Sequence, residues 1–437
     1  MAASSTRDSG LCYNGHWSSA KKLIGIESDG ARRQPVTMSG SGSATVLDDL
    51  PEWIVVEEIL VRLPPEDLLR CRAVRKCWHS ATSTGKFMLD HHRRQPILPI
   101  LRDAYRRLFV LGNATMCQQQ LCPILRSYSY GYGTLHAALD GLLIVSHGDQ
   151  FFVCNPVTRK CATLGMPQSR QGSELYIAGF YRHQPSGEYR VLWVSVSHVP
   201  SYNEIPRTFY FVVAVGSDDT RCIRQGGSPR PTSSSPSLEM ALRGGLGSSD
   251  GFPPVHYRGS LHWKLGKFSG CDDTSYIMVF DTTAETFRLI CQPAQLRPED
   301  LLFLEMDGTL ALCRFSSDRD TIDVWVMQDY DTETWSFKHR ITLSWVDPLP
   351  PADAKQAVFP RMVVVNEGEL LIQFARSCVL RYGTDGKFLG YVKNEEDQEI
   401  GLWITKHYLQ QSVIPLPPFH EMSEDGANQE PPFFLGL

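Results

Sequence analysis

The stretch that decides the amino-terminal fold is LPEWIVVEEILVRLPPEDLLRCRAVRKCWH, residues 50–79. Its first apolar side chains recur at the i, i+3, i+4, i+7 spacing of one helix face: Val56, Ile59, Leu60 and Leu63, with Trp53 and Ile54 one turn earlier. Pro51 suits the first turn of a helix, and Pro64-Pro65 prevents its continuation after Leu63. The pattern therefore predicts an amphipathic helix from Pro51 to Leu63.

Two more helices are expected after this one. The second starts at Pro65, carries Glu66 and Asp67 in its first turn and runs towards Val74, and the third covers Arg75 to Thr82. Three helices within some forty residues expose more apolar side chain than so small a core can bury. We expect part of this apolar surface to contact a partner.

Beyond about Ala104 the pattern is that of β-strands. Short β-branched and aromatic runs, such as Tyr189 to Val196 and Phe209 to Val215, alternate with turn residues. Three Asp-Gly pairs stand between apolar runs, and this dipeptide supplies the positive φ angles of a tight type I′ hairpin: Asp140-Gly141, Asp307-Gly308 and Asp385-Gly386. These features predict an all-β domain built of hairpins.

An approximate repeat runs through the same region. A Gly-led apolar strand is followed by a turn containing Asn or Asp, as in Asn155-Pro156-Val157-Thr158-Arg159, and Asp281-Thr282 and Asp331-Thr332 lie roughly 50 residues apart. This period is typical of four-stranded propeller blades. About 300 residues then predict a β-propeller of six or seven blades.

Charge and cysteine content restrict the class of partner. The 43 basic and 48 acidic residues give a formal charge of -5, which offers no footprint for nucleic acid or an anionic membrane. The 12 cysteines lack the spacing of zinc knuckles, so we expect reduced thiols in a cytoplasmic or nuclear protein. No secretory signal and no run of roughly 20 apolar residues is present.

The helical stretch resembles the F-box motif. The resemblance spans about forty residues in order and spacing and is carried by Leu50-Pro51, Glu58-Ile59-Leu60, Arg62-Leu63-Pro64, Leu68-Leu69-Arg70-Cys71-Arg72-Ala73-Val74 and Lys76-Cys77-Trp78-His79. Arg75 and Cys77 stand where many relatives have Cys and Ser. Asp140-Gly141-Leu142-Leu143 and Val153-Cys154-Asn155-Pro156-Val157-Thr158-Arg159 are similar to the F-box-associated domains common in plants.

The predicted organisation is an α+β multidomain chain, with a small three-helix F-box before an all-β, propeller-like domain. Its parts are a disordered leader at 1–46, the F-box at 47–90, a linker at 91–103, the β domain at 104–411 with a disordered insertion at 225–254, and a loose tail at 412–437. The resemblance implies a Skp1-type adaptor as the partner of the F-box and, through it, a cullin. The docking residues it implies are Leu50, Pro51, Ile54, Ile59, Leu60, Leu63, Pro64, Leu68, Val74 and Trp78.

The function implied is that of a non-catalytic subunit of a Skp1–cullin–F-box ubiquitin ligase, which presents a protein target on the β domain. The sequence contains no Gly-rich phosphate loop, no dinucleotide fingerprint and no His-Glu-x-x-His frame, and we expect no metal or cofactor. The alternatives are a propeller scaffold that binds a protein or glycan outside any ligase, and a propeller enzyme with its site in the central channel. The sequence names no substrate-binding residue.

Overall fold

The computed structural model describes most of the chain after residue 49. The described residues are 50–103, 108–111, 118–120, 133–168, 172–197, 207–217, 219–225, 236–247, 251, 253–265, 276–293, 295–296, 301–344, 360–365, 368–375, 378–392 and 402–416. The predicted leader at 1–46 lies outside them. No helix in these ranges is both long and apolar enough to cross a membrane.

The first predicted helix changes its hydrogen-bonding register twice. It consists of an α-helical turn, α1 (Glu52–Ile54), a π-helical segment, η2 (Val55–Ile59), and a 3-10 turn, η3 (Leu60–Arg62). The chain becomes extended at Leu63, and α2 (Pro65–Val74) follows with its proline in the first turn as predicted. Arg75 is extended, with φ of −135° and ψ of 131°, and separates α2 from α3 (Lys76–Thr82).

A fourth helix and a strand occupy the segment predicted as a linker. Helix α4 (Gly85–Arg94) begins where the Thr84 hydroxyl accepts a hydrogen bond from the Phe87 amide, and it continues beyond the predicted F-box end at residue 90. Strand β1 (Ile97–Asp103) follows at once. Helix α4 was not predicted because two of its buried residues, His91 and His92, are polar, so the spacing of apolar residues does not indicate a helix here.

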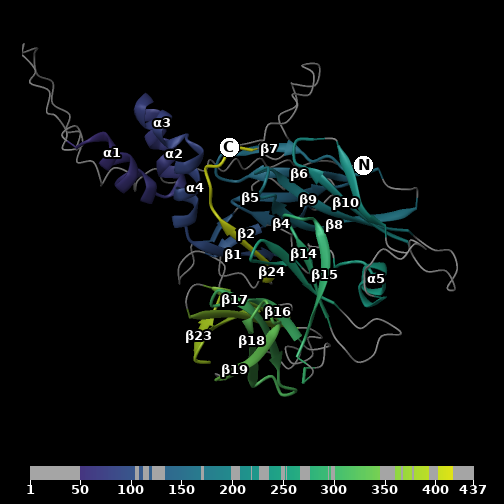
Figure 1. The fold of residues 1–437 in the computed structure, drawn as a ribbon. Helices are drawn as coiled ribbons and strands as arrows, with labels where there is room; N and C mark the ends of the chain where they lie inside the picture. Colours follow the sequence, from purple (N-terminus) through teal and green to yellow (C-terminus); the bar gives the residue numbers. More distant parts are fainter. Residues whose placement is uncertain are drawn as a thin grey trace, which may run out of the picture. The chain divides into compact units, whose positions relative to one another are not determined.

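The described residues from Ile97 onward include six four-stranded antiparallel sheets, which are the blades of a β-propeller (Figure 1). One blade is β4 (Thr134–Leu139), β5 (Leu142–His147), β6 (Gln150–Asn155) and β7 (Lys160–Thr163). The next is β8 (Ser173–Arg182), β9 (Tyr189–Ser197), β10 (Thr208–Ala214) and β11 (Thr220–Gln225). The third is β12 (Val255–Tyr257), β13 (Ser260–Lys264), β14 (Tyr276–Asp281) and β15 (Thr286–Cys291).

The fourth blade is β16 (Leu301–Met306), β17 (Thr309–Phe315), β18 (Thr321–Asp329) and β19 (Thr334–Thr342), and the fifth is β20 (Arg361–Val365), β21 (Glu369–Ala375), β22 (Cys378–Gly383) and β23 (Phe388–Tyr391). The sixth joins the two ends of the domain, because β24 (Leu402–Gln410) pairs with β1, followed by β2 (Leu108–Leu111) and β3 (Gln118–Gln120). The predicted β-propeller is confirmed, with six blades.

Two of the three predicted Asp-Gly turns have both residues at positive φ. Asp140 and Gly141 have φ of 50° and 80°, and Asp307 and Gly308 have φ of 52° and 70°. At the third pair only Gly386 has positive φ. At this turn the Asp385 carboxylate accepts a hydrogen bond from the Lys387 amide, and backbone bonds from the Gly383 amide to the Lys387 carbonyl and from the Gly386 amide to the Gly383 carbonyl close it.

A second turn type recurs in three blades and corrects the register of the repeat. Its first residue accepts two hydrogen bonds from the amides two and three residues ahead, and its fifth has positive φ: Asn155 with Arg159, Asp281 with Glu285, and Asp329 with Glu333. Asp329, rather than Asp331, is therefore the equivalent of Asp281.

Two segments predicted to be disordered contain ordered parts. Helix α5 (Pro236–Arg243) lies within the predicted insertion, and its apolar side chains are buried in a core shared by two blades: Leu238, Ala241 and Leu242, with Leu246 just beyond the helix. Residues 412–416 of the predicted tail are also described, with Ser412 and Val413 buried. Both segments were predicted to be disordered because serine, proline and glycine dominate the surrounding sequence, and their apolar runs are short.

Candidate functional site: the helical surface and its junction with the propeller

The ten predicted docking residues divide into an interior group and a surface group. Leu60, Leu68 and Trp78 are 2%, 0% and 7% exposed. The surface group comprises half-buried Leu50, Ile54, Ile59 and Leu63 and exposed Pro51, Pro64 and Val74. The structure therefore assigns three of the ten to the packing of the helices on one another.

Polar contacts reinforce that packing around Trp78. The Thr82 hydroxyl donates to the Trp78 carbonyl at 2.7 Å, and Arg72 donates to the same hydroxyl and to the Thr82 carbonyl at 2.9 and 2.6 Å. The Arg75 guanidinium lies 4.9 Å from the centroid of the Trp78 ring. The Arg72–Thr82 contacts hold α2 against α3.

Two large apolar side chains protrude from the helices. Val74, at the end of α2, is 70% exposed, and Trp53, in α1, is 61% exposed. Aromatic anchors dominate the energetics of protein interfaces, so an exposed tryptophan beside half-buried Ile54 is a strong candidate contact. Trp53 belongs to the predicted apolar stripe but not to the predicted docking set. The sequence could have identified Trp53 as a docking residue, because it is a tryptophan on the predicted apolar stripe.

Helix α4 joins this helical segment to the propeller. His92 is buried, and its Nδ1 lies 3.1 Å from the Gln411 carbonyl oxygen, just after β24. The Gln410 side chain returns a hydrogen bond of 2.9 Å to the Gln95 carbonyl. The neighbouring His91 lies 2.8 Å from the Leu63 carbonyl, and burial lowers its pKa. Adjacent histidines thus contact the propeller on one side and the helices on the other.

The Asp140-Gly141 turn is the second part of this junction. His92 Nε2 lies 3.5 Å from one Asp140 carboxylate oxygen, and the Tyr189 hydroxyl donates to the other at 2.9 Å. Burial raises the pKa of Asp140, but the hydrogen bonds from His92 and Tyr189 outweigh it, so this pKa lies below its usual range. A Cβ added to Gly141 would lie 2.3 Å from the Ser412 Cβ, which leaves room only for glycine.

Tyr189→Phe removes one hydrogen bond to this carboxylate, and we expect it to lower the free energy of unfolding by about 1–2 kcal/mol at pH 7. The pKa of Asp140 is lower in the folded chain than in the unfolded chain. The stabilisation that the ionised Asp140 carboxylate provides is therefore complete above its unfolded-state pKa, and it is lost as the pH falls through its folded-state pKa. The difference between variant and wild type should stay constant from about pH 5 to 8 and shrink below about pH 4. Urea unfolding at several pH values measures it, and a difference that grows with acidity would contradict the assignment.

Asn155 is the third part of the junction and is fully buried. Its amide nitrogen donates to the carbonyls of Ser412 and Ile414 at 3.1 and 2.8 Å, while its oxygen accepts from the amides of Val157 and Thr158. All the hydrogen-bonding capacity of the side chain is therefore used. The sequence predicted the turn at Asn155 but not its partners, which lie about 260 residues further along the chain.

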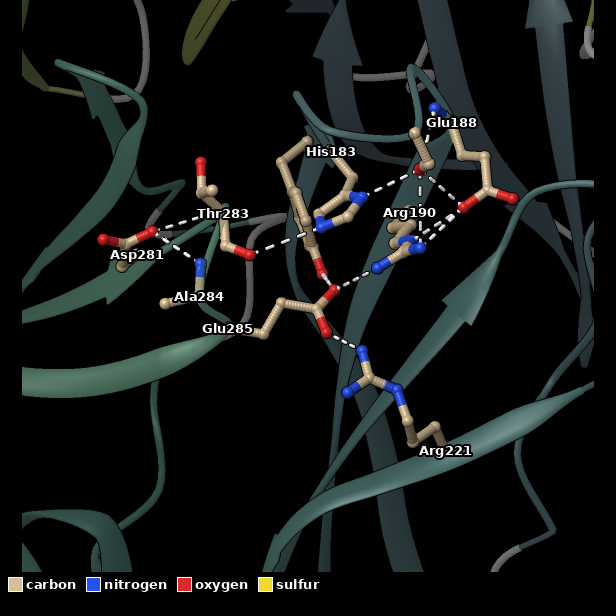
Figure 2. Close-up of polar contacts among 10 residues, drawn as sticks. His183, Glu188, Arg190, Arg221, Asp281, Thr283, Ala284 and Glu285 are labelled. Carbon is tan, nitrogen blue, oxygen red and sulfur yellow. Dashed lines mark hydrogen bonds and ion pairs between the residues drawn. The ribbon is translucent and has the colours of Figure 1, made fainter.

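A buried ionic cluster links two neighbouring blades (Figure 2). The Glu285 side chain is 5% exposed and accepts hydrogen bonds from the Tyr181 hydroxyl at 2.6 Å and from Arg190 at 2.7 Å, and it also pairs with Arg221. Glu285 comes from the turn between β14 and β15, whereas its three partners come from β8, β9 and β11. Burial raises the pKa of Tyr181 above its usual range, which keeps this hydroxyl a donor.

Beside this cluster a serine and a histidine meet on the exposed β8–β9 hairpin (Figure 2). His183 Nδ1 lies 2.8 Å from the Ser186 hydroxyl, which donates to Glu188 at 2.8 Å. His183 Nε2 faces the Thr283 carbonyl at 3.3 Å. The serine proton is directed to a carboxylate rather than to the imidazole, so this arrangement stabilises a hairpin and does not activate a nucleophile. No group of His, Cys, Asp and Glu suited to a metal ion occurs among the described residues.

The fold and the helical surface define a class of protein: a six-bladed β-propeller preceded by a few helices that expose apolar side chains. A family described as F-box associated beta propeller domain matches residues 113–378, which is more than half of the chain. The chain belongs to this family and is an F-box protein of the plant type, as the sequence predicted. Proteins of this family are typically non-catalytic adaptors.

The relatives are consistent with this assignment. An F-box protein of Arabidopsis thaliana is 23% identical over 380 residues, covering 83% of this chain and 96% of its own. F-box protein CPR1 of the same plant is 24% identical over 310 residues, covering 64% and 70%. Among solved structures, dipeptidyl peptidase 4 of Porphyromonas gingivalis is 9% identical, with a TM-score of 0.33 over 63% of this chain and 47% of its own.

Proposed function

We propose that this chain is the substrate-recognition adaptor of a Skp1–cullin–F-box ubiquitin ligase. The helical segment binds a Skp1-type adaptor, which brings a cullin, and the propeller holds a protein target. The observation that carries this proposal is the pair of exposed apolar side chains, Trp53 and Val74, on helices that resemble an F-box. The compartment proposed for it is the cytoplasm or the nucleus.

The surface has the composition of an interface core. The helices that carry the two exposed anchors also hold half-buried Ile54, Ile59 and Leu63 and the exposed ion pairs Arg62–Glu58 and Arg70–Asp67. A hydrophobic centre with a polar rim is typical of protein–protein interfaces. The predicted residues Leu60, Leu68 and Trp78 are buried within the same helical segment.

In the proposed mechanism the chain catalyses by proximity. Holding a target beside a charged ubiquitin-conjugating enzyme raises the effective concentration of the target lysines, so transfer needs no side chain of this protein as acid, base or nucleophile. Contacts between α4 and the propeller, made through His92 and Gln95, would limit how far the bound target can move.

The decisive variant is Val74→Asp, because this side chain is exposed and the substitution leaves the helix packing intact. We expect co-purification of a Skp1-type adaptor with the full chain to fall at least about tenfold, as for a residue at the centre of an interface. The thermal unfolding midpoint should stay within about 1 °C of wild type. Trp53→Ala should weaken the same interaction.

Met166→Asp is the matched control, since Met166 is an exposed apolar residue of the propeller, 45% exposed. It should leave Skp1 binding unchanged. Leu60→Asp is not diagnostic by itself, because a charge at a 2% exposed position disrupts the helices as well as the surface. Wild-type Skp1 binding by both Val74→Asp and Trp53→Ala would refute the proposal and favour a propeller scaffold outside any ligase.

A further inference from the structure

Two cysteines face each other across neighbouring strands of one blade. Cys154 in β6 and Cys161 in β7 are directly opposite partners in the antiparallel ladder. Their sulfur atoms lie 2.7 Å apart. Directly opposed residues of antiparallel strands have Cα atoms about 4.5–5.5 Å apart, which lies within the range of about 4.4–6.8 Å spanned by disulfides.

The two sulfurs differ in their access to solvent. Cys154 is fully buried, whereas Cys161 is partly exposed. A reagent in solution therefore reaches Cys161 first, and Cys154 is already in place for the second step. The strand register pairs Cys222, Cys291, Cys313 and Cys378 with residues other than cysteine, so among the described cysteines of the sheets only this pair is opposed.

We propose that Cys154 and Cys161 form a reversible cross-strand disulfide when the chain meets a disulfide oxidant such as glutathione disulfide. The Cys161 thiolate attacks one sulfur of the oxidant, forming a mixed disulfide and releasing one glutathione thiol. The Cys154 thiolate then attacks the Cys161 sulfur and releases the second glutathione. The two protein thiols lose two hydrogens in total, and the oxidant gains them.

The position of this pair gives the bond a structural effect. Cys154 immediately precedes Asn155, whose side chain holds the Ser412 and Ile414 carbonyls. A bond between Cys154 and Cys161 closes the hairpin that carries this turn. The oxidised chain should therefore hold the junction more firmly, with a rise in Tm of about 1–4 °C.

The test treats the purified full chain with glutathione disulfide, blocks the remaining thiols by alkylation and measures the mass. Compared with the chain alkylated without oxidant, we expect a species that lacks two alkyl groups, and a dithiol reductant added before the alkylation should abolish this difference. Trypsin cleaves after Arg159 and Lys160, so the two cysteines fall on separate peptides that remain together only when linked. A linked Cys154–Cys161 peptide pair identifies the bond.

Three variants make the test decisive. Cys154→Ser should accumulate the glutathione adduct on Cys161, Cys161→Ser should give neither adduct nor link at this hairpin, and Cys291→Ser should still form the link. An adduct on Cys161 of the wild-type chain that never resolves to the linked pair would overturn the proposal. So would a link between either cysteine and a different partner.

Discussion

Glu285→Ala is expected to lower the free energy of unfolding by about 3–5 kcal/mol, the typical cost of removing one partner from a buried ion pair. The carboxylate is 5% exposed and is the common acceptor for Tyr181, Arg190 and Arg221. Without it, Arg190 keeps Glu188, at 2.6 Å, but the Tyr181 hydroxyl loses the acceptor at 2.6 Å that satisfies it in the interior. Equilibrium unfolding in urea measures the loss.

Glu333→Ala is the matched control. Glu333 occupies the same position of the same turn in the next blade, with φ of 55° against 52° for Glu285, so the backbone cost of alanine is common to both. Its side chain is 32% exposed and pairs with Arg288, which is itself 43% exposed. Such a partly exposed pair contributes about 0–1 kcal/mol. Equal losses at both positions would show that the turn, and not the buried cluster, sets the stability.

The parts of the fold that depend on near neighbours were predictable from the sequence. Asp140-Gly141 and Asp307-Gly308 form the predicted hairpins because the two residues themselves determine the backbone angles. The blade period is also local, since in five of the six blades every strand pairs only with its neighbours along the chain. The closing contact of β24 with β1 joins residues some 300 positions apart, and no local pattern specifies it.

The candidate docking surface was predictable as a set but not residue by residue. Helical spacing identifies an apolar face, yet it cannot tell Leu68, which the chain itself covers, from Val74, which it leaves exposed. That distinction depends on the crossing of α2 and α3, which starts at the extended Arg75. The junction was missed for a related reason: its partners for Asn155 lie in a proline-rich segment whose composition predicts a loose tail.

The last prediction concerns that asparagine. Asn155→Asp is expected to lower the free energy of unfolding by about 3–5 kcal/mol, at least as much as Asn155→Ala. The amide nitrogen now donates to the Ser412 and Ile414 carbonyls, and a carboxylate would bring a second oxygen against both. The oxygen that accepts from the Val157 and Thr158 amides is kept, but the buried charge gains no new donor in place of the two carbonyls that its second oxygen then faces.

Asp281→Asn is the control. In the three blade turns either asparagine or aspartate accepts the two hydrogen bonds from the amides two and three residues ahead. Asp281 accepts from the amides of Thr283 and Ala284 at 2.7 and 2.9 Å on an exposed turn, and asparagine can do the same. This change should cost less than about 1 kcal/mol. Amide exchange at 411–416 should rise at least about tenfold in Asn155→Asp and stay unchanged in Asp281→Asn. Exchange that rises equally in both would mean that the asparagine serves its turn alone, whereas the expected difference identifies it as the residue that fastens the end of β24 to the neighbouring blade.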